Sequence, residues 1–320
     1  MRSACPKGRA CGWRTVPSDE ELGAGMVDKP YLSVHIWRQW PFRAMHDDRQ
    51  GRSWIMAQGR TVLVTGGTSG IGLAIAETFA RAGDSLILLG SSPERDYTGA
   101  VQAVQAAGRE AGHDVQVCAH GVNITDFDAV KALLKTISDK VGLLDVLVHS
   151  AGVFFNTPIT DETPDAFDRV MRINVNGMWH IVQAALPFIR RKEGDVPGGK
   201  VVAISSICGF YSFAGYAGYA ASKAAATALV RSLALELGPL GININAVEPG
   251  RVKTSMHDAL INDPSQADAL RAVAEANPSK RTFSSPEDIA AVVQFLASPG
   301  AVALHGSAIV VDEGTSLGLV

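Results

Sequence analysis

The chain has 320 residues, of which 47% are hydrophobic and 19% are charged. This composition predicts a globular protein with a sizeable core and argues against a largely disordered chain. A formal net charge of −3 gives no reason to expect nucleic acid or an anionic membrane as a partner, and no apolar run approaches the roughly 20 residues that span a bilayer.

The N-terminal residues 1–56 differ in composition from the rest of the chain. They contain four of the five tryptophans, namely Trp13, Trp37, Trp40 and Trp54, and they show no sustained periodicity. We expect a poorly ordered extension here, followed by one domain over residues 57–320. Two alternatives remain open: a functional arm that docks a partner or a lipid surface, or a working protein that begins at Met56.

From Gln58 onward, short β-type runs alternate with helix-length amphipathic stretches. The runs are rich in Val, Ile and Leu on both faces, as strands buried in a parallel sheet are. They lie at 61–65, 86–89, 115–118, 146–148, 200–204, 242–247 and 308–311, with helical stretches at 73–82, 129–141, 166–189 and 219–237. This alternation predicts a single doubly wound Rossmann-type α/β domain, with a mostly parallel seven-stranded sheet in three α/β/α layers. Ligands of such folds bind at the carboxyl ends of the strands.

The segment TGGTSGIG, residues 65–72, lies between the first predicted strand and the first predicted helix. Its glycines permit a tight turn, and the helix N-terminus adds a partial positive charge for a pyrophosphate. The position of the motif between strand and helix predicts a dinucleotide site. The expected contact residues are Gly66, Thr68, Ser69, Gly70, Ile71 and Gly72.

The second predicted strand ends at Leu89 and continues as Gly-Ser-Ser-Pro-Glu-Arg. An acidic residue after this strand usually selects NAD and a basic one NADP. No carboxylate occupies the expected place, and the first basic residue is Arg95. NADP is therefore favoured over NAD, with Ser91, Ser92 and Arg95 near the 2′-phosphate; a polar loop with little discrimination is the alternative.

Three residues predict the chemistry of the site. Ser206 follows the fifth predicted strand, while Tyr219 and Lys223 lie four residues apart on the next helix and so share one face. A neighbouring cation favours the phenolate, so we expect Lys223 to lower the pKa of Tyr219 from about 10. These residues suit hydride transfer between a nicotinamide cofactor and a carbonyl or alcohol carbon, with Tyr219 as general acid/base.

These motifs, TGGTSGIG, Ser206 and Tyr-Ala-Ala-Ser-Lys at 219–223, resemble those of the short-chain dehydrogenase/reductase family, over about residues 58–315. The resemblance implies that Lys223 also holds the nicotinamide ribose and that Asn174 anchors a water chain leading to it. It also implies further cofactor contacts along the nucleotide, at Asn123, Ile124, Ala151, Gly152, Pro249, Gly250, Val252 and Thr254.

Several residues depart from the family pattern. His149-Ser150 stands where the family usually has Asn-Asn, and we interpret His149 as a hydrogen-bonded structural residue. Glu248 and Glu313 are also unusual, and each either tunes the mouth of the site or is a surface variant. The four cysteines, Cys5, Cys11, Cys118 and Cys208, form no C-x-x-C pair, and no metal site is expected; reduced thiols predict a cytoplasmic location.

The resemblance is broadest to 3-oxoacyl-carrier-protein reductases and to sugar or polyol dehydrogenases, so the substrate is a small carbonyl or alcohol that the sequence leaves unidentified. We expect residues 255–281 to cover the site. The family implies a homo-oligomer, a tetramer or dimer, packed through the helices at 166–189 and 219–237. The alternative function is a catalytically silent dinucleotide-binding sensor or scaffold. A nucleotide-sugar epimerase is disfavoured by the glycine spacing.

Overall fold

Seven short strands form one parallel sheet at the centre of the described part of the chain. The computed structural model describes residues 59–160, 164–191 and 198–317. The sheet order is β3-β2-β1-β4-β5-β6-β7, and every strand pair is parallel. The strands are β1 Thr61–Thr65, β2 Ser85–Gly90, β3 Val117–Gly121, β4 Val146–His149, β5 Lys200–Ile204, β6 Asn243–Pro249 and β7 Ala308–Val311. The predicted fold class is thus confirmed. The order in which successive strands join the sheet reverses between β1 and β4, and such folds bind ligands at this point.

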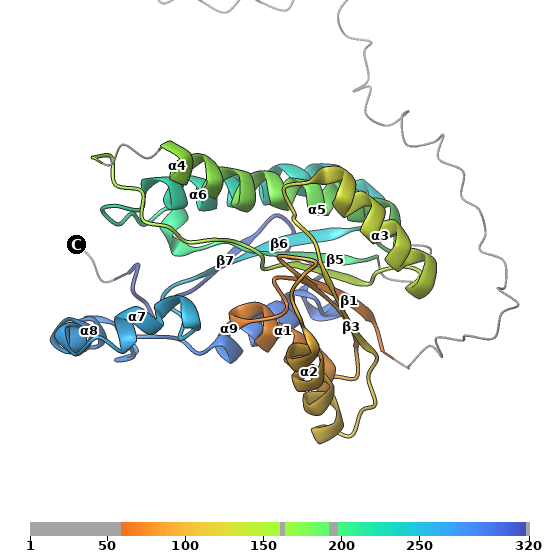
Figure 1. The fold of residues 1–320 in the computed structure, drawn as a ribbon, viewed down its shortest axis with the longest axis horizontal. Helices are drawn as coiled ribbons and strands as arrows, with labels where there is room; N and C mark the ends of the chain where they lie inside the picture. The colour runs from red at the N-terminus through yellow and green to blue at the C-terminus, as the bar shows by residue number, and fades with distance from the viewer. Residues whose placement is uncertain (1–58, 161–163, 192–197, 318–320) are drawn as a thin grey trace, which may run out of the picture. The chain divides into compact units, whose positions relative to one another are not determined.

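Helices cover both faces of the sheet (Figure 1). They are α1 Gly70–Arg81, α2 Thr98–Glu110, α3 Phe127–Val141, α4 Pro164–Met171, α5 Gly177–Ala185, α6 Ala217–Leu237, α7 Asp258–Ile261, α8 Ala267–Ala276 and α9 Pro286–Leu296. Helices α3, α5 and α6 pack on one face, and α1, α2 and α9 on the other. The described part of the chain therefore has the expected three layers.

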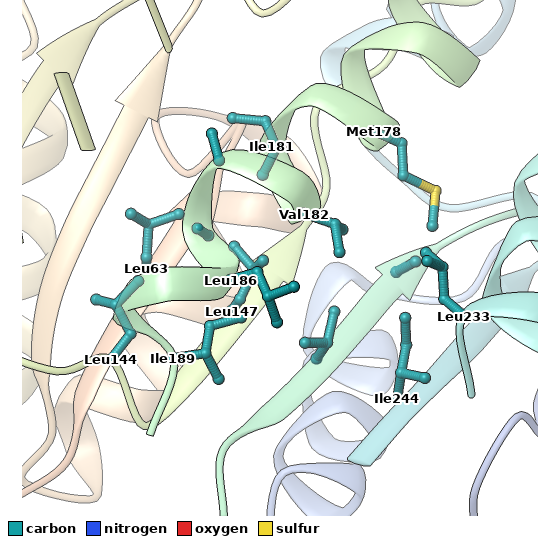
Figure 2. Packing of buried hydrophobic residues seen from close by; sticks show 14 of the residues in the cluster. Leu63, Leu144, Leu147, Met178, Ile181, Val182, Leu186, Ile189, Leu233 and Ile244 are labelled. Atoms are coloured by element: carbon teal, nitrogen blue, oxygen red, sulfur yellow. The ribbon is translucent and has the colours of Figure 1, made fainter. Parts of the chain in front are cut away.

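Alternation along each strand divides the apolar side chains between two cores. In β1, Leu63 joins the core under α3, α5 and α6, whereas Val62 and Val64 join the core under α1, α2 and α9. Figure 2 shows the first core, in which Leu63 and Leu147 of the sheet belong to one buried cluster with Ile181 of α5. Full burial of each such side chain stabilises the fold by about 1.5–3 kcal/mol.

The structure changes some predicted boundaries. The predicted strands at 115–118 and 242–247 lie at Val117–Gly121 and Asn243–Pro249. The single helix expected at 166–189 is interrupted by a π-helical turn, Arg172–Asn176. Helix α2 was not expected from its sequence, because only Val104, Ala107 and Gly108 of it are buried.

The predicted extension, residues 1–56 with its tryptophans and Met56, lies outside the described residues. Among the helices that the structure describes, none is long and apolar enough to cross a membrane.

Candidate active site

The glycine-rich segment after β1 forms a turn that excludes larger side chains. Gly66 has a φ of +67°, and a Cβ there would lie 2.9 Å from the backbone of Ala151. A Cβ on Gly72 would lie 2.2 Å from the carbonyl oxygen of Gly66. Helix α1 begins directly after Ser69, whose side chain makes no capping hydrogen bond. The first turn of α1 therefore presents backbone N–H groups and a partial positive charge, which suits a pyrophosphate.

Two adjoining cavities lie at the carboxyl ends of the central strands, one of about 690 Å³ and one of about 210 Å³. They share Gly66, Ser69, Ala151, Gly152 and Val153 as lining residues. One crevice therefore runs from the end of β2, past the glycine turn, to the start of α6. Its position at the point where the strand order reverses is the one that holds dinucleotides in this class of fold.

The structure brings most of the predicted cofactor residues to this crevice. Thr68, Ser91, Asn123 and Ile124 line the larger cavity. The smaller cavity is lined by Gly70, Ile71, Gly72, Ser206, Tyr219, Lys223, Pro249, Gly250, Val252 and Thr254. Ser92 is the exception among the predicted cofactor residues: it lines neither cavity, because its side chain contacts Glu94 and its backbone N–H donates to the Tyr97 hydroxyl at 3.0 Å.

Two arginines that sequence reasoning missed also line the larger cavity. Arg169 of α4 and Arg172 of the π-helical turn lie there together with Arg95, which follows β2. No carboxylate is among the described residues that line this cavity. The signal was present in the sequence, since Arg169 and Arg172 are three residues apart on one helical segment and so share a face. Because both lie more than 70 residues after Arg95, the sequence did not show that the three arginines line the same cavity.

The three residues expected to carry the chemistry converge on the smaller cavity. Lys223 Nζ donates a hydrogen bond of 2.9 Å to the carbonyl oxygen of Ile204 and lies 5.6 Å from the centroid of the Tyr219 ring. Ser206 Oγ accepts from the backbone N–H of Cys208 at 3.1 Å and makes a long contact of 3.5 Å with the carbonyl oxygen of Pro249. The hydroxyl groups and the ammonium thus lie around one opening.

Asn174 lies behind this set, in the π-helical turn, where only 3% of it is exposed. Its Oδ1 accepts from the N–H of Val153 at 2.8 Å, and its Nδ2 donates to Val153 O and to Ser222 Oγ, both at 3.0 Å. Isolated π turns are frequent at functional sites. The amide joins the segment after β4 to α6 and lines neither cavity, so the water chain implied by the resemblance stays a prediction.

Burial sets the protonation of the two titratable groups. Burial raises the pKa of Tyr219, and the Cys208 thiol adds to this, while the hydrogen bond with Ser206 lowers it. The net pKa of Tyr219 is therefore raised and not lowered as we expected, because desolvation of the phenolate outweighs the hydrogen bond with Ser206. Burial also lowers the pKa of Lys223, to about 8.

His149 at the end of β4 is a buried neutral residue. Its Nδ1 lies 3.0 Å from Thr65 Oγ1, and the same hydroxyl accepts from the N–H of Ala151 at 3.2 Å. Burial, with a smaller effect of Lys223, lowers the pKa of His149 to about 3. The ring thus links β1 to the segment after β4, in agreement with the structural role expected for it.

Both unusual glutamates are bound by other side chains, and Glu248 departs from both roles expected for it. Glu248 is 5% exposed and accepts a hydrogen bond of 2.7 Å from Thr227 Oγ1, so it is neither a surface residue nor part of the lining of the mouth. Glu313 pairs with Arg281 at 2.7 Å and accepts from Ser284 Oγ at 2.7 Å.

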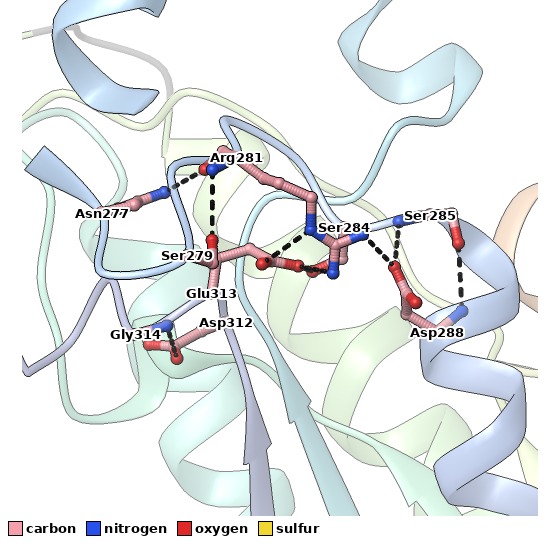
Figure 3. Close-up of polar contacts among 9 residues, drawn as sticks. All are labelled: Asn277, Ser279, Arg281, Ser284, Ser285, Asp288, Asp312, Glu313 and Gly314. Atoms are coloured by element: carbon pink, nitrogen blue, oxygen red, sulfur yellow. Dashed lines mark hydrogen bonds and ion pairs between the residues drawn. The ribbon is translucent and has the colours of Figure 1, made fainter. Parts of the chain in front are cut away.

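Arg281 connects the segment that carries α7 and α8 to the body of the sheet. Figure 3 shows its guanidinium between Glu313, which follows β7, and Asp288 in the first turn of α9. Within the segment, Thr254, Ser255, Met256 and His257 line the smaller cavity. The cover that we expected over residues 255–281 thus contacts the cavity through its beginning and is held at its end by Arg281.

Aromatic rings adjoin the predicted proton-transfer residue. Phe154 stacks on Tyr216 with centroids 4.6 Å apart and meets Tyr219 edge-on at 4.8 Å. His257 lies 6.4 Å from Phe154, and its Nδ1 bonds to the carbonyl oxygen of Val252 at 2.9 Å. These contacts hold the Tyr219 ring against one wall of the site.

Comparison with known proteins agrees with this geometry. A family model described as "Enoyl-(Acyl carrier protein) reductase" matches residues 66–316. The oxidoreductase UcpA of Escherichia coli strain K12 is 36% identical over 264 residues, which is 81% of this chain and 95% of UcpA. The 3-oxoacyl-[acyl-carrier-protein] reductase FabG of Aquifex aeolicus is 34% identical over 267 residues, covering 81% of this chain and 98% of FabG.

Among solved structures, a short-chain dehydrogenase from Burkholderia cenocepacia J2315 in complex with NADP is similar, with a TM-score of 0.69 and 30% identity over 81% of this chain and 98% of that one. The chain belongs to the short-chain dehydrogenase/reductase family and is an oxidoreductase.

Proposed function

We propose that this enzyme transfers a hydride between a nicotinamide cofactor and a small carbonyl or secondary alcohol, with Tyr219 as general acid/base. The observation that carries the proposal is the convergence of Ser206, Tyr219 and Lys223 on a cavity of about 210 Å³ that continues into the nucleotide-sized crevice. The glycine turn, which a Cβ would fill at Gly66 and Gly72, and the start of α1 fit the pyrophosphate of such a cofactor.

The side chains of the site hold the substrate oxygen in position and give it a proton. The bound nicotinamide would supply the hydride that goes to the carbonyl carbon. Ser206 Oγ donates a hydrogen bond to the substrate oxygen, and Tyr219 Oη gives that oxygen its proton. The raised pKa of Tyr219 keeps the hydroxyl protonated, which is the form that reduction requires. The Lys223 ammonium stabilises the resulting phenolate until a proton from solvent restores it.

NADP is the proposed cofactor. Arg95, Arg169 and Arg172 give the larger cavity a positive lining without a carboxylate, and a 2′-phosphate is the part of the cofactor that such a lining recognises. Ser91 and Thr68 offer additional hydroxyl groups there. The NADP complex of the Burkholderia cenocepacia relative supports this choice.

We also propose a homo-oligomer. Large apolar side chains are exposed on three neighbouring helices: Phe167 on α4 at 44%, Trp179 on α5 at 39% and Leu235 on α6 at 81%. An association through these helices would remove them from water. The free thiols of Cys118 and Cys208 support a cytoplasmic location, where thiols stay reduced.

Binding and turnover measurements test the function together. NADPH and NADH are titrated against the full chain by fluorescence, followed by a panel of small ketones, 3-oxoacyl thioesters, sugars and polyols, with a 2-enoyl thioester as a separate arm. We expect tighter binding of NADPH and turnover of a carbonyl compound. Failure to bind either cofactor, or reduction of the enoyl double bond alone, would contradict the proposal.

A further inference from the structure

A buried carboxylate lies beside the predicted catalytic residues and takes no part in the steps above. Glu248 of β6 is 5% exposed, and its Oε1 accepts a hydrogen bond of 2.7 Å from Thr227 Oγ1 of α6. Among the described residues it forms no ion pair. A carboxyl group at such depth costs free energy unless hydrogen bonds compensate for its lost hydration, so its bond to Thr227 is a strong structural constraint.

Thr227 extends this link to the end of β5. Its Oγ1 lies 2.9 Å from Ser205 Oγ, which also lies 2.9 Å from the carbonyl oxygen of Lys223. Because the Thr227 hydroxyl donates its hydrogen to Glu248, the single hydrogen of the Ser205 hydroxyl is shared between Thr227 Oγ1 and the Lys223 carbonyl. Thr227 is 5% exposed and Ser205 is 3% exposed. A continuous set of buried polar groups therefore joins β6, α6 and β5, and we call Glu248, Thr227 and Ser205 the buried link.

Each member of the buried link adjoins a residue of the predicted site. Ser205 directly precedes Ser206, Glu248 directly precedes Pro249, and Thr227 lies four residues after Lys223, on the same face of α6. Hydrogen bonds weaken steeply outside a narrow range of distance and angle. The buried link therefore fixes three separate chain segments, each of which carries part of the site, relative to one another.

We propose that Glu248 is a positioning residue, which acts through Thr227 and Ser205 to hold the Ser206 hydroxyl at a set distance from the Tyr219–Lys223 pair. The inference rests on the proposed function, in which Ser206 and Tyr219 hold the same substrate oxygen. Glu248 touches none of the reacting atoms. An apolar pair at 227 and 248 would pack α6 on β6 equally well but would leave Ser205 without this connection.

Matched substitutions separate positioning from simple packing. Thr227→Val and Glu248→Met remove the polar groups at nearly constant volume, whereas Thr227→Ser and Glu248→Gln retain them. Thr78→Val is the control, because it removes a helical threonine hydroxyl that, among the described residues, bonds only to Ala74 O of its own helix α1, at 2.8 Å, away from the buried link. The values of kcat and KM are measured on the full chain at a temperature where circular dichroism shows every variant folded.

Thr227→Val and Glu248→Met, the two disconnecting variants, break the buried link. Each should lower kcat by about tenfold to 100-fold, as small displacements of catalytic groups do, with little change in the KM for the cofactor. The Ser and Gln variants should keep most of the wild-type kcat. The kcat of the double variant Thr227→Val/Glu248→Met should be no lower than that of the less active single variant, because both changes break the same connection. Wild-type kcat in both disconnecting variants, or equal losses in Thr227→Ser and Thr227→Val, would overturn the proposal.

Amide hydrogen exchange gives a readout that needs no substrate. Loss of the buried link should speed exchange in segments 204–209 and 217–228 and leave the rest of the described chain unchanged. Unchanged exchange in both segments would also overturn the proposal. If exchange changes as expected but the wild type turns over no carbonyl compound, the proposed function fails and the buried link stands.

Discussion

Lys223 Nζ donates a hydrogen bond of 2.9 Å to the carbonyl oxygen of Ile204, the last residue of β5. This bond holds the ammonium against the end of the sheet, where only 8% of the residue is exposed. The depth that makes Lys223 a well-positioned cation also makes its charge costly, and burial lowers its pKa to about 8.

The first prediction is that cofactor affinity falls as the pH rises through about 8. Lysine is charged below its pKa, so the Lys223 ammonium, which we expect to hold the nicotinamide ribose, is present in the folded protein only below about pH 8. An ordinary lysine keeps its charge up to about pH 10.4. Titration of NADPH by fluorescence at a series of pH values measures this. Lys223→Arg should show no such fall, because a guanidinium stays charged; a flat wild-type profile would contradict the prediction.

The second prediction concerns proton transfer. Tyr219→Phe removes the proposed proton donor but leaves the ring that packs against Phe154. We expect kcat to fall by about 10²–10⁴-fold, the usual contribution of a positioned acid or base, with NADPH binding retained. Tyr216→Phe is the matched control, since it deletes a hydroxyl that no proposed step uses from the ring stacked on Phe154. Full turnover in Tyr219→Phe would rule out the mechanism.

The third prediction concerns the choice of cofactor. Arg95→Gln, Arg169→Gln and Arg172→Gln each remove a positive group from the larger cavity. A hydrogen bond to a charged group contributes about 1.5–3 kcal/mol, so each loss should raise the Kd for NADPH by roughly tenfold or more. The Kd for NADH should not change. Arg109→Gln in the last turn of α2 changes the net charge equally outside the cavity, and its NADPH affinity should match the wild type.

The fourth prediction concerns the cover of the site. The Glu313 side chain is only 7% exposed where Arg281 pairs with it. Arg281→Gln leaves that carboxylate without its cation, so we expect the free energy of unfolding, measured with urea, to fall by more than it does when a fully exposed pair is broken. The exposed pair of Arg271 with Asp268 supplies the control: Arg271→Gln should stay within about 0.5 kcal/mol of the wild type. Equal effects of the two variants would show that the Arg281 pair does not hold the segment.

Much of the fold and of the site could be predicted from local sequence. Apolar runs such as 200–204 locate strands because a strand buried on both faces needs apolar side chains throughout. The spacing of Tyr219 and Lys223 predicts their shared face, since the helix period alone sets it. Resemblance to the family added Asn174 and the segment from Pro249, which no local pattern marks.

The sequence by itself thus determined the fold class, the glycine turn and the shared helix face of Tyr219 and Lys223, because each depends on neighbours a few positions away. Tertiary structure alone decided that Arg169 and Arg172 join Arg95 at one cavity, and that Glu248 is buried beside α6. It also decided the direction of the Tyr219 pKa. Desolvation and proximity between distant segments arise only when the helices pack on the sheet, and no spacing along the chain records them.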